Sequence, residues 1–435
     1  MARYLLAASP IPGHVTPMLA VAADLQRRGH QVRLLTGARF RESAVAQGIP
    51  FSALATDAAV TRAESPRSGA PGMVRRWRTG RAELRTGFLD PIAGQFRALT
   101  AELARTEFDA VFVDVMFTGA VPLLLAGTPR PPVLACGVVP LMLSSADTPP
   151  FGMAWHPRAG RDYTAMHDVV RHVLFRGGQR RLDAILRELG LGPAPCSPLD
   201  WPVLADRLLQ FTVPEFEYPR RDLPSSVVFT GPIPIDRAGA RLPSWWNELS
   251  TARTVVHVTQ GTWDNGDLDQ LIRPTLAALR GRSELAVVAC TGGSAAALGP
   301  IPANAYVTDF VPYADLLPRV DVMITNGGYG GVQQALRHGV PLIVAGDTAD
   351  KPEIAARVAY TGAGIDLGTA RPGPAALAAA VDQVSSNGEF RSAAAGLAKS
   401  MTKVSPFEVI SGVLADLDPR AGLAEAPVAG NGESR

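Results

Sequence analysis

Cysteine is scarce in this sequence, which contains only three in 435 residues: Cys136, Cys196 and Cys290. They lie far apart and lack the close spacing of a metal site or a disulfide framework. We expect buried, neutral thiols in a reducing compartment. Long hydrophobic runs are missing too. The first apolar run, Tyr4–Ser9, is far shorter than a membrane span, and no basic region precedes it. A cytoplasmic protein without stable membrane association is therefore expected.

The sequence also has no excess of charge of either sign. Lys and Arg number 42 and Asp and Glu number 40, which gives a formal net charge of +2. Such a balance offers no field that would attract a polyanion, so we predict no nucleic-acid partner.

Three common nucleotide-binding and hydrolase motifs are absent. No G-x-x-x-x-G-K-[ST] pattern occurs, which excludes a Walker-type phosphate loop. No G-x-G-x-x-G follows the first apolar run, where the sequence contains Ile11-Pro12-Gly13-His14 instead, so the dinucleotide fingerprint is excluded as well. The G-x-S-x-G elbow of serine hydrolases is missing.

What is present is a repeated alternation of strand-like and helix-like segments over a length that suits two domains. This alternation predicts an α/β fold with two doubly wound parallel sheets. The expected strands are Tyr4–Ala8, Gln31–Leu35, Val111–Val113, Val133–Val139, Thr254–Val258, Leu285–Cys290, Ala305–Val307, Val320–Ile324 and Pro341–Val344. The expected helices are Thr16–Arg28, Leu268–Arg280, Gly331–His338, Ala375–Val384 and Phe407–Leu417.

Stretches rich in proline, glycine and charge divide the chain. Gly231–Trp246 has the composition of a linker. We expect domains over 1–230 and 251–402, a linker over 231–250, a helix over 403–417 that packs back on the first domain, and a disordered tail over 418–435. Arg62–Arg85 and Ser144–Asp162 are expected to be irregular loops, either functional lids or surface decoration.

A glycine-rich loop stands between the strand Val320–Ile324 and the helix that follows it. Its glycines are Gly327, Gly328, Gly330 and Gly331. Unpaired N–H groups at a helix start, with the helix dipole, attract anions, and bare backbone allows close approach. The loop therefore predicts a phosphate site, and the alternative is close packing of helix on sheet.

Two further strand ends point toward the same site. Gly261-Thr262 follows a strand, and the Thr262 hydroxyl with nearby N–H groups is suited to a second phosphate. Phe310 follows another strand and is suited to stack on a nucleobase, a contact worth about 1–3 kcal/mol. Ordinary core packing is the alternative for Phe310.

His14 and Asp114 form the candidate acid–base pair. His14 follows the first strand, and Asp114 ends the run Val111–Val113 in the same predicted sheet. A carboxylate orients an imidazole and stabilises its protonated form. Because no nucleophile motif accompanies the pair, we expect the substrate to supply the nucleophile.

These elements together resemble the inverting, metal-independent UDP-glycosyltransferases (family 1, GT-B fold), particularly the actinobacterial enzymes that glycosylate natural products. The resemblance extends over about Tyr4–Leu417. It is strongest over Val307–Gly368, which matches the donor-binding signature, and includes the short G-H-x-x-P element around His14. It implies two facing Rossmann-like domains with a cleft between them, the first binding the acceptor and the second the nucleotide sugar.

The resemblance assigns roles to the candidate residues. His14 would deprotonate the acceptor hydroxyl, supported by Asp114. The residues in donor-binding positions are Gly261, Thr262, Phe310, Val311, Asn326, Gly327, Gly328, Gly330, Gly331, Gln334, Asp350 and Lys351. A UDP- or dTDP-linked sugar is the implied co-substrate, with no cofactor and no metal. Direct displacement with inversion is the implied mechanism.

Five of these positions depart from the family pattern. Asn326 replaces a histidine that contacts the diphosphate, which keeps a hydrogen-bond donor but removes a potential positive charge. Gln334 replaces the glutamate that holds the ribose, and Lys351 replaces a glutamine that contacts the sugar. The pair Gly330-Gly331 replaces residues with side-chain donors, so the phosphates would depend on backbone N–H groups.

The expected function is transfer of a sugar, glucose from UDP-glucose in the first instance, to a hydroxyl of a small apolar natural product by a monomer or homodimer. Apolar residues expected to line the acceptor pocket are Met116, Phe117, Met142, Phe151 and Trp155, with local core as their alternative role. The alternatives are a dTDP-deoxysugar or C-glycosyltransferase, a lipid glycosyltransferase using the arginines between Arg75 and Arg85, a nucleotide-sugar epimerase, and a noncatalytic auxiliary protein.

Overall fold

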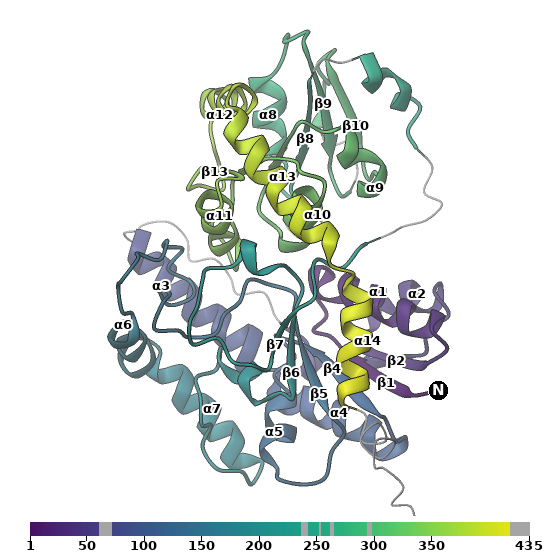
Figure 1. Ribbon diagram of the computed structural model, residues 1–435, viewed down its shortest axis with the longest axis vertical. Coiled ribbons are helices and arrows are strands. Elements are labelled where there is room, and N and C mark those ends of the chain that lie inside the picture. The colour runs from purple at the N-terminus through teal and green to yellow at the C-terminus, as the bar shows by residue number, and fades with distance from the viewer. Residues whose placement is uncertain (61–71, 236–241, 252–253, 262–264, 294–297, 418–435) are drawn as a thin grey trace, which may run out of the picture.

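In the computed structural model the chain folds into two α/β domains, one above the other (Figure 1). The structure describes residues 1–60, 72–235, 242–251, 254–261, 265–293 and 298–417. Thr262 and the tail 418–435 lie outside the described residues, as do parts of the linker.

The N-terminal domain is built on a parallel sheet of seven strands in the order β3-β2-β1-β4-β5-β6-β7. Its strands are β1 (Arg3–Ala7), β2 (Gln31–Gly37), β3 (Phe51–Leu54), β4 (Ala110–Asp114), β5 (Val133–Gly137), β6 (Arg207–Gln210) and β7 (Val227–Phe229). Its helices are α1 (Pro12–Arg27), α2 (Arg41–Val45), α3 (Gly72–Glu83), α4 (Ile92–Arg105), α5 (Ala120–Leu125), α6 (Thr164–Val169) and α7 (Arg176–Glu188). Strands β4 and β5 are buried along their whole length, as expected for parallel strands covered on both faces.

The C-terminal domain repeats this plan with six parallel strands in the order β10-β9-β8-β11-β12-β13. Its strands are β8 (Thr254–Thr259), β9 (Leu285–Cys290), β10 (Ala305–Thr308), β11 (Val322–Thr325), β12 (Leu342–Val344) and β13 (Gly364–Asp366). Its helices are α8 (Ile272–Ala278), α9 (Tyr313–Leu316), α10 (Tyr329–Arg337), α11 (Lys351–Tyr360), α12 (Pro374–Ser386) and α13 (Gly388–Lys403). The prediction of two doubly wound parallel sheets is confirmed.

The last helix, α14 (Pro406–Leu417), lies alongside the N-terminal domain, whereas α13 before it lies on the C-terminal domain (Figure 1). Ile410 and Val413 of α14 are buried in the hydrophobic core of the N-terminal domain. Glu408 also pairs with Arg28, at 2.7 Å from its Nη2. The chain therefore crosses between the domains at the linker and again between α13 and α14.

Several element boundaries differ from the sequence prediction. Helix α1 begins at Pro12, so His14 lies in its first turn instead of in a preceding loop. Helix α8 begins at Ile272, because the Gln260 side chain accepts hydrogen bonds from the Leu271 and Ile272 N–H groups and so fixes the helix start. Such a cap from a distant strand end leaves no signal in the local sequence.

Two expectations about loops and thiols also need correction. Arg62–Arg85 was expected to be irregular, but the described part forms α3 over Gly72–Glu83. Ser144–Asp162 contains no helix or strand, as expected. Cys136 and Cys290 are buried free thiols, but Cys196 is only partly buried. Burial raises the pKa of Cys196 to about 11 and that of Cys290 to about 12.

In the part of the chain that the structure describes, no helix is both long enough and apolar enough to cross a bilayer.

Candidate active site

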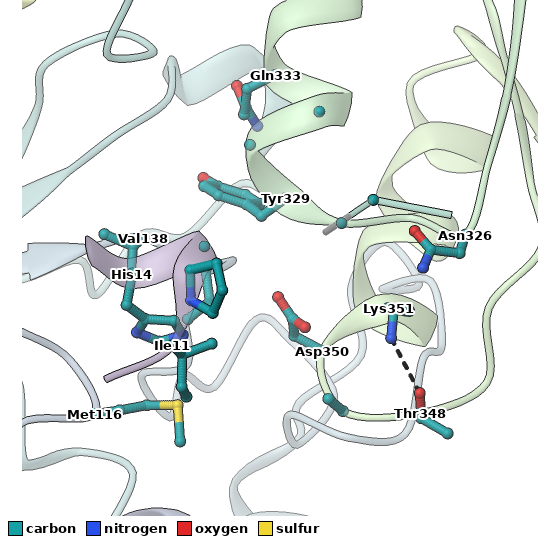
Figure 2. A pocket seen from close by; sticks show the side chains of 18 of the residues that line it. Ile11, His14, Met116, Val138, Asn326, Tyr329, Gln333, Thr348, Asp350 and Lys351 are labelled. Atoms are coloured by element: carbon teal, nitrogen blue, oxygen red, sulfur yellow. Dashed lines mark hydrogen bonds between the residues drawn. The ribbon is translucent and has the colours of Figure 1, made fainter. Parts of the chain in front are cut away.

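A pocket of about 1230 Å³ lies between the two domains and is lined by both. The N-terminal domain contributes α3 and the segments that follow β1, β4 and β5, and the C-terminal domain contributes those after β8, β10, β11 and β12. These are the carboxyl ends of the strands, where ligands bind in doubly wound sheets. In Figure 2, His14 lies on one side of the pocket and Asn326, Asp350 and Lys351 lie on the other.

His14 and Asp114 are in direct contact on the N-terminal side. His14 Nδ1 is 2.7 Å from Asp114 Oδ1, and Asp114 is fully buried. The Asp114 carboxylate also accepts hydrogen bonds from the N–H groups of Ser9, at 2.5 Å, and Met116, at 2.8 Å. Since an ionised carboxylate only accepts, His14 Nδ1 carries the proton of this hydrogen bond and the other ring nitrogen is the basic one.

The glycine-rich loop forms a tight bend and a helix start, as predicted, but the helix begins at Tyr329, two residues earlier than expected. Gly327 has φ +86° and makes the bend, and it is not among the residues that line the pocket. Gly328, Gly330 and Gly331 do line it. The first intrahelical bond is donated by Val332, so the three N–H groups before it have no partner within α10.

The side-chain amides of Asn326 and Gln334, two of the residues that differ from the family pattern, both donate hydrogen bonds to backbone carbonyls. Asn326 Nδ2 donates to the Gln260 carbonyl at 2.5 Å, and Gln334 Nε2 donates to the Ile233 carbonyl in the linker at 3.0 Å. The NH₂ group of Asn326 has a second N–H, so a contact of this residue with the diphosphate stays a prediction.

Asp350 and Lys351 stand at the start of α11 and line the pocket. Lys351 Nζ is 3.1 Å from Thr348 Oγ1 (Figure 2). Among the described residues that line the pocket, Lys351 is the only lysine or arginine. Glu83 from α3 of the other domain accepts from the Ala349 N–H at 3.2 Å, and burial raises the pKa of this carboxyl. The N-terminal domain thus contacts the loop that carries Asp350.

The expected base-binding residues also lie at the pocket. Phe310 is 41 % exposed and Val311 is buried, and both line the pocket together with Gly261. A residue with this exposure lies at the surface of the pocket and not in the core, which was the alternative for Phe310. Thr262 lies outside the described residues.

Of the apolar residues expected around the acceptor, Met116, Met142, Phe151 and Trp155 line the pocket. Phe117 does not, because its side chain is fully buried in the core of the N-terminal domain. Adjacent residues after β4 point in different directions, and the sequence has no signal there that separates the core residue from the pocket residue.

Sequence reasoning missed several lining residues. Glu83 lies in an arginine-rich stretch that was expected to be irregular. Gln260 directly precedes Gly261, so the position of Gln260 at a strand end was a signal that could have identified it. Others gain their place only from the packing of the two domains: Trp77, Val138, Val139, Leu174, Phe175, Phe211, Ile233, Ile235, Tyr313, Tyr329 and Gln333.

Comparison with known proteins gives this site its context. Residues 275–415 match the model of the erythromycin biosynthesis protein CIII-like C-terminal domain, and residues 11–104 match the glycosyltransferase family 28 N-terminal domain. A 4'-demethylrebeccamycin synthase from Lentzea aerocolonigenes is 37% identical over 414 residues, covering 91% of this chain and 94% of that protein. The chain belongs to the family 1 glycosyltransferases of the natural-product type. Its enzyme class is therefore that of a sugar transferase, as the resemblance implied.

Further relatives of this glycosyltransferase include a UDP-glucosyltransferase A1 from Starmerella bombicola, which is 31% identical over 88% of this chain and 85% of its own length. Among solved structures, the kitacinnamycin glycotransferase superposes with a TM-score of 0.70 at 21% identity, over 96% of this chain and 99% of its own. A spinosyn rhamnosyltransferase complexed with thymidine diphosphate has a TM-score of 0.67 at 20% identity, with 94% and 99% covered. These structures share the GT-B fold. A nucleotide-sugar donor and a small-molecule acceptor follow from family membership.

Proposed function

We propose that this glycosyltransferase moves glucose from UDP-glucose to a hydroxyl of a small, largely apolar acceptor, with inversion at the anomeric carbon and without a metal ion. The observation that supports it most is the buried His14–Asp114 pair, which faces the glycine-rich helix start across one pocket. The pair has no protein nucleophile of its own, so an acceptor hydroxyl is the group for it to activate.

His14 acts as the general base in this proposal. Asp114 accepts the hydrogen bond from Nδ1–H and is itself held by two backbone N–H groups, which fixes the ring of a residue that lines the pocket. The basic nitrogen is then the other ring nitrogen. That nitrogen takes the proton of the acceptor hydroxyl. The acceptor oxygen forms a bond to the anomeric carbon from the face opposite the diphosphate. The bond from that carbon to the phosphate oxygen breaks, and its electron pair leaves with the nucleoside diphosphate.

The departing diphosphate is stabilised by groups that are fixed before the reaction. The N–H groups of the first turn of α10 carry the positive end of the helix dipole, and Gly330 and Gly331 leave them accessible. Lys351 adds a full positive charge from the start of α11. Asp267 and Asp269, which resemble an acidic metal motif, do not line the pocket, and Asp267 pairs with Arg371. The proposal therefore needs no metal.

The choice of donor rests on the relatives. Several relatives with about the same span are UDP-glucosyltransferases, including that of Starmerella bombicola. The apolar lining by Met116, Met142 and Phe151 supports an apolar acceptor. Free, unpaired cysteines support action in the cytoplasm. A dTDP-deoxysugar is the alternative donor, and C-linkage is the alternative bond.

A binding and product screen tests this proposal. Calorimetry with UDP, dTDP and their sugars identifies the donor, and mass spectrometry with phenolic and macrolide acceptors identifies the product. We expect UDP-glucose to bind and to yield a glucoside whose anomeric configuration, determined by NMR, is opposite to that of the donor. Retained configuration contradicts the mechanism, and a nucleotide sugar that is epimerised without transfer contradicts the function. Co-sedimentation with anionic liposomes would instead point to a lipid acceptor.

A further inference from the structure

Glu353 is a buried carboxylate that belongs to one domain and holds a loop of the other. It lies in the first turn of α11, in the C-terminal domain, and its side chain is 5 % exposed. Its Oε1 accepts hydrogen bonds from the N–H groups of Gly152, at 2.8 Å, and Ala154, at 2.7 Å, both in the N-terminal domain. Glu353 is not among the residues that line the pocket. Any effect of Glu353 on a ligand in the pocket must therefore pass through the groups that it touches.

The backbone at these two N–H groups has an unusual conformation. Gly152 has φ +95°, and Ala154, with φ +55°, is one of only two non-glycine residues with positive φ in the described part of the chain. A side chain disfavours this left-handed region, so such a residue persists only where its surroundings hold it. N–H groups that converge in a turn of this kind form a concave site for an anion, and here Glu353 supplies the anion. The path of the loop at Ala154 therefore depends on a carboxylate of the other domain.

The side chains beside these N–H groups line the pocket. Phe151 precedes Gly152, Met153 stands between the two held residues, and Trp155 follows Ala154. We call Phe151, Met153 and Trp155 the pocket wall. All three side chains are apolar, and Trp155 is 43 % exposed. Because the held backbone alternates with the pocket wall along the chain, releasing it would move all three side chains.

The second oxygen of Glu353 is bound to a buried cluster that holds another part of the pocket. Glu353 Oε2 is 2.9 Å from Arg357 Nη1, and Arg357 Nε is 2.7 Å from Glu217 Oε2. Glu217 Oε1 accepts from the Leu141 N–H at 2.8 Å, directly before Met142, which lines the pocket. Each carboxylate thus gives one oxygen to Arg357 and the other to backbone beside the pocket. A carboxylate that only neutralised the guanidinium could engage it with both oxygens, as bidentate pairs do.

We infer that Glu353 is a positioning residue for the acceptor, because it holds the backbone that sets the place of the pocket wall. In this inference, which rests on the proposed function, the acceptor packs against the pocket wall. Glu353 then contributes to acceptor binding, although it belongs to the helix whose start, Asp350 and Lys351, lines the opposite side of the pocket. It makes no contribution to nucleotide binding.

The test is a comparison of acceptor and nucleotide affinities in Glu353→Gln. An amide has one acceptor atom, so it cannot serve Arg357 and the loop at once. Arg357 keeps Glu217 as a charged partner, and thermal melting checks that the variant folds. With saturating UDP-glucose and the phenolic acceptor on which the wild type is most active, we expect the KM for the acceptor to rise about tenfold. The kcat, and the affinity for UDP by calorimetry, should stay within about threefold of the wild type.

The matched control is Asp222→Asn. Asp222 Oδ2 accepts from the Ala146 N–H at 2.8 Å, which is the same kind of bond to the same loop, but it comes from the N-terminal domain. Neither Asp222 nor Ala146 lines the pocket, so the KM for the acceptor should not change. If Asp222→Asn raises this KM as much as Glu353→Gln does, or if Glu353→Gln weakens acceptor and UDP equally, Glu353 only stabilises the fold and the inference is wrong.

A second variant tests the pocket wall without disturbing the ionic cluster. Trp155→Ala replaces a half-exposed side chain, and we expect it to raise the KM for the acceptor about tenfold, as for a lost aromatic contact. Adding Glu353→Gln to it should raise the KM by a smaller factor than in the wild type, because part of what Glu353 positions is already gone. An unchanged KM in Trp155→Ala, or full additivity, contradicts the inference. Absence of any transfer by the wild type instead contradicts the proposed function.

Discussion

Arg357 of the C-terminal domain is in contact with Glu217 of the N-terminal domain, with 2.7 Å between Nε and Oε2, and both side chains are almost wholly buried. Glu353, one helical turn before Arg357, is 2.9 Å from its Nη1. Burial disfavours a charged guanidinium, yet the pKa of Arg357 is raised overall because these two carboxylates lie against it. The domains are thus joined by a buried ionic cluster.

This cluster also reaches the acceptor side of the pocket. Glu353 Oε1 accepts from the N–H groups of Gly152, at 2.8 Å, and Ala154, at 2.7 Å. These residues belong to the loop that contributes Phe151 and Trp155 to the pocket. Helix α11 therefore has Asp350 and Lys351 at its start and, in the same first turn, Glu353 holds the loop of Gly152 and Ala154.

Removing the charge of Arg357 is expected to destabilise the enzyme strongly. Arg357→Met leaves the carboxylates of Glu217 and Glu353 buried without their partner, which costs about 3–5 kcal/mol of unfolding free energy. Urea unfolding followed by tryptophan fluorescence measures this loss. Arg371→Met is the control, because Arg371 pairs with Asp267 at the surface, where such pairs contribute about 1 kcal/mol or less. Equal effects of the two substitutions would show that the buried cluster has no special role.

A side chain at Gly328 is expected to block the donor site without disturbing the fold. Its backbone is extended (φ −61°, ψ 128°), and an added Cβ meets only Asn326 Oδ1, at 3.9 Å. Gly328→Val should therefore melt within about 2 °C of the wild type, as is usual for substitutions that create neither strain nor a cavity. Its affinity for UDP should fall about tenfold or more because the side chain occupies the approach to the helix start. Unchanged UDP affinity by calorimetry argues against a phosphate site at this loop.

Acid is expected to destabilise the fold through His257. Its ring is fully buried in β8 beside Tyr313, with Nδ1 2.9 Å from the Val288 carbonyl, and burial lowers its pKa to about 4. Above pH 6.5 the residue is neutral in both states. Below pH 6.5 His257 binds a proton in the unfolded chain but stays neutral in the folded chain. The free energy of unfolding therefore falls between pH 6.5 and 4, by about 3 kcal/mol in total.

The control for this pH effect is His257→Gln, which removes the titrating group. Urea unfolding of both proteins is measured at intervals from pH 7 to pH 4. We expect the stability advantage of the wild type over the variant to shrink as the pH falls. An advantage that stays constant over this range would show that His257 titrates alike in the folded and unfolded states.

The sequence was sufficient for the fold and for most of the candidate pocket. Fully buried parallel strands appear in the sequence as continuous apolar runs, and such runs located β8, β9 and β11. Because parallel strands end at the same edge of a sheet, His14 and Asp114 could be predicted to lie close together. The strands β3, β6, β7 and β13, each of three or four residues, were missed.

The details that decide chemistry were not available from the sequence. The residue type at Asn326 suggested a hydrogen-bond donor, but it did not indicate that its Nδ2 donates to the carbonyl of Gln260, 66 positions away. The sequence could not separate Phe117, which is in the core, from Met116, which faces the pocket. Glu353 stands in the donor signature, yet its partners are the N–H groups of a loop in the other domain. All three details depend on contacts between segments that are distant in the sequence, and local sequence patterns do not indicate such contacts.

The transfer rate of His14→Ala, with UDP affinity measured on the same preparation, tests whether His14 is the base. Because His14 is the proposed base and lies across the pocket from the glycine-rich loop, we expect a loss in kcat of about 10²-fold or more. UDP affinity should stay within about threefold of the wild type, since a group that makes no contact with the nucleotide contributes little to its binding. A variant that keeps full transfer activity would contradict the assignment of His14 as the base, and with it the proposed mechanism.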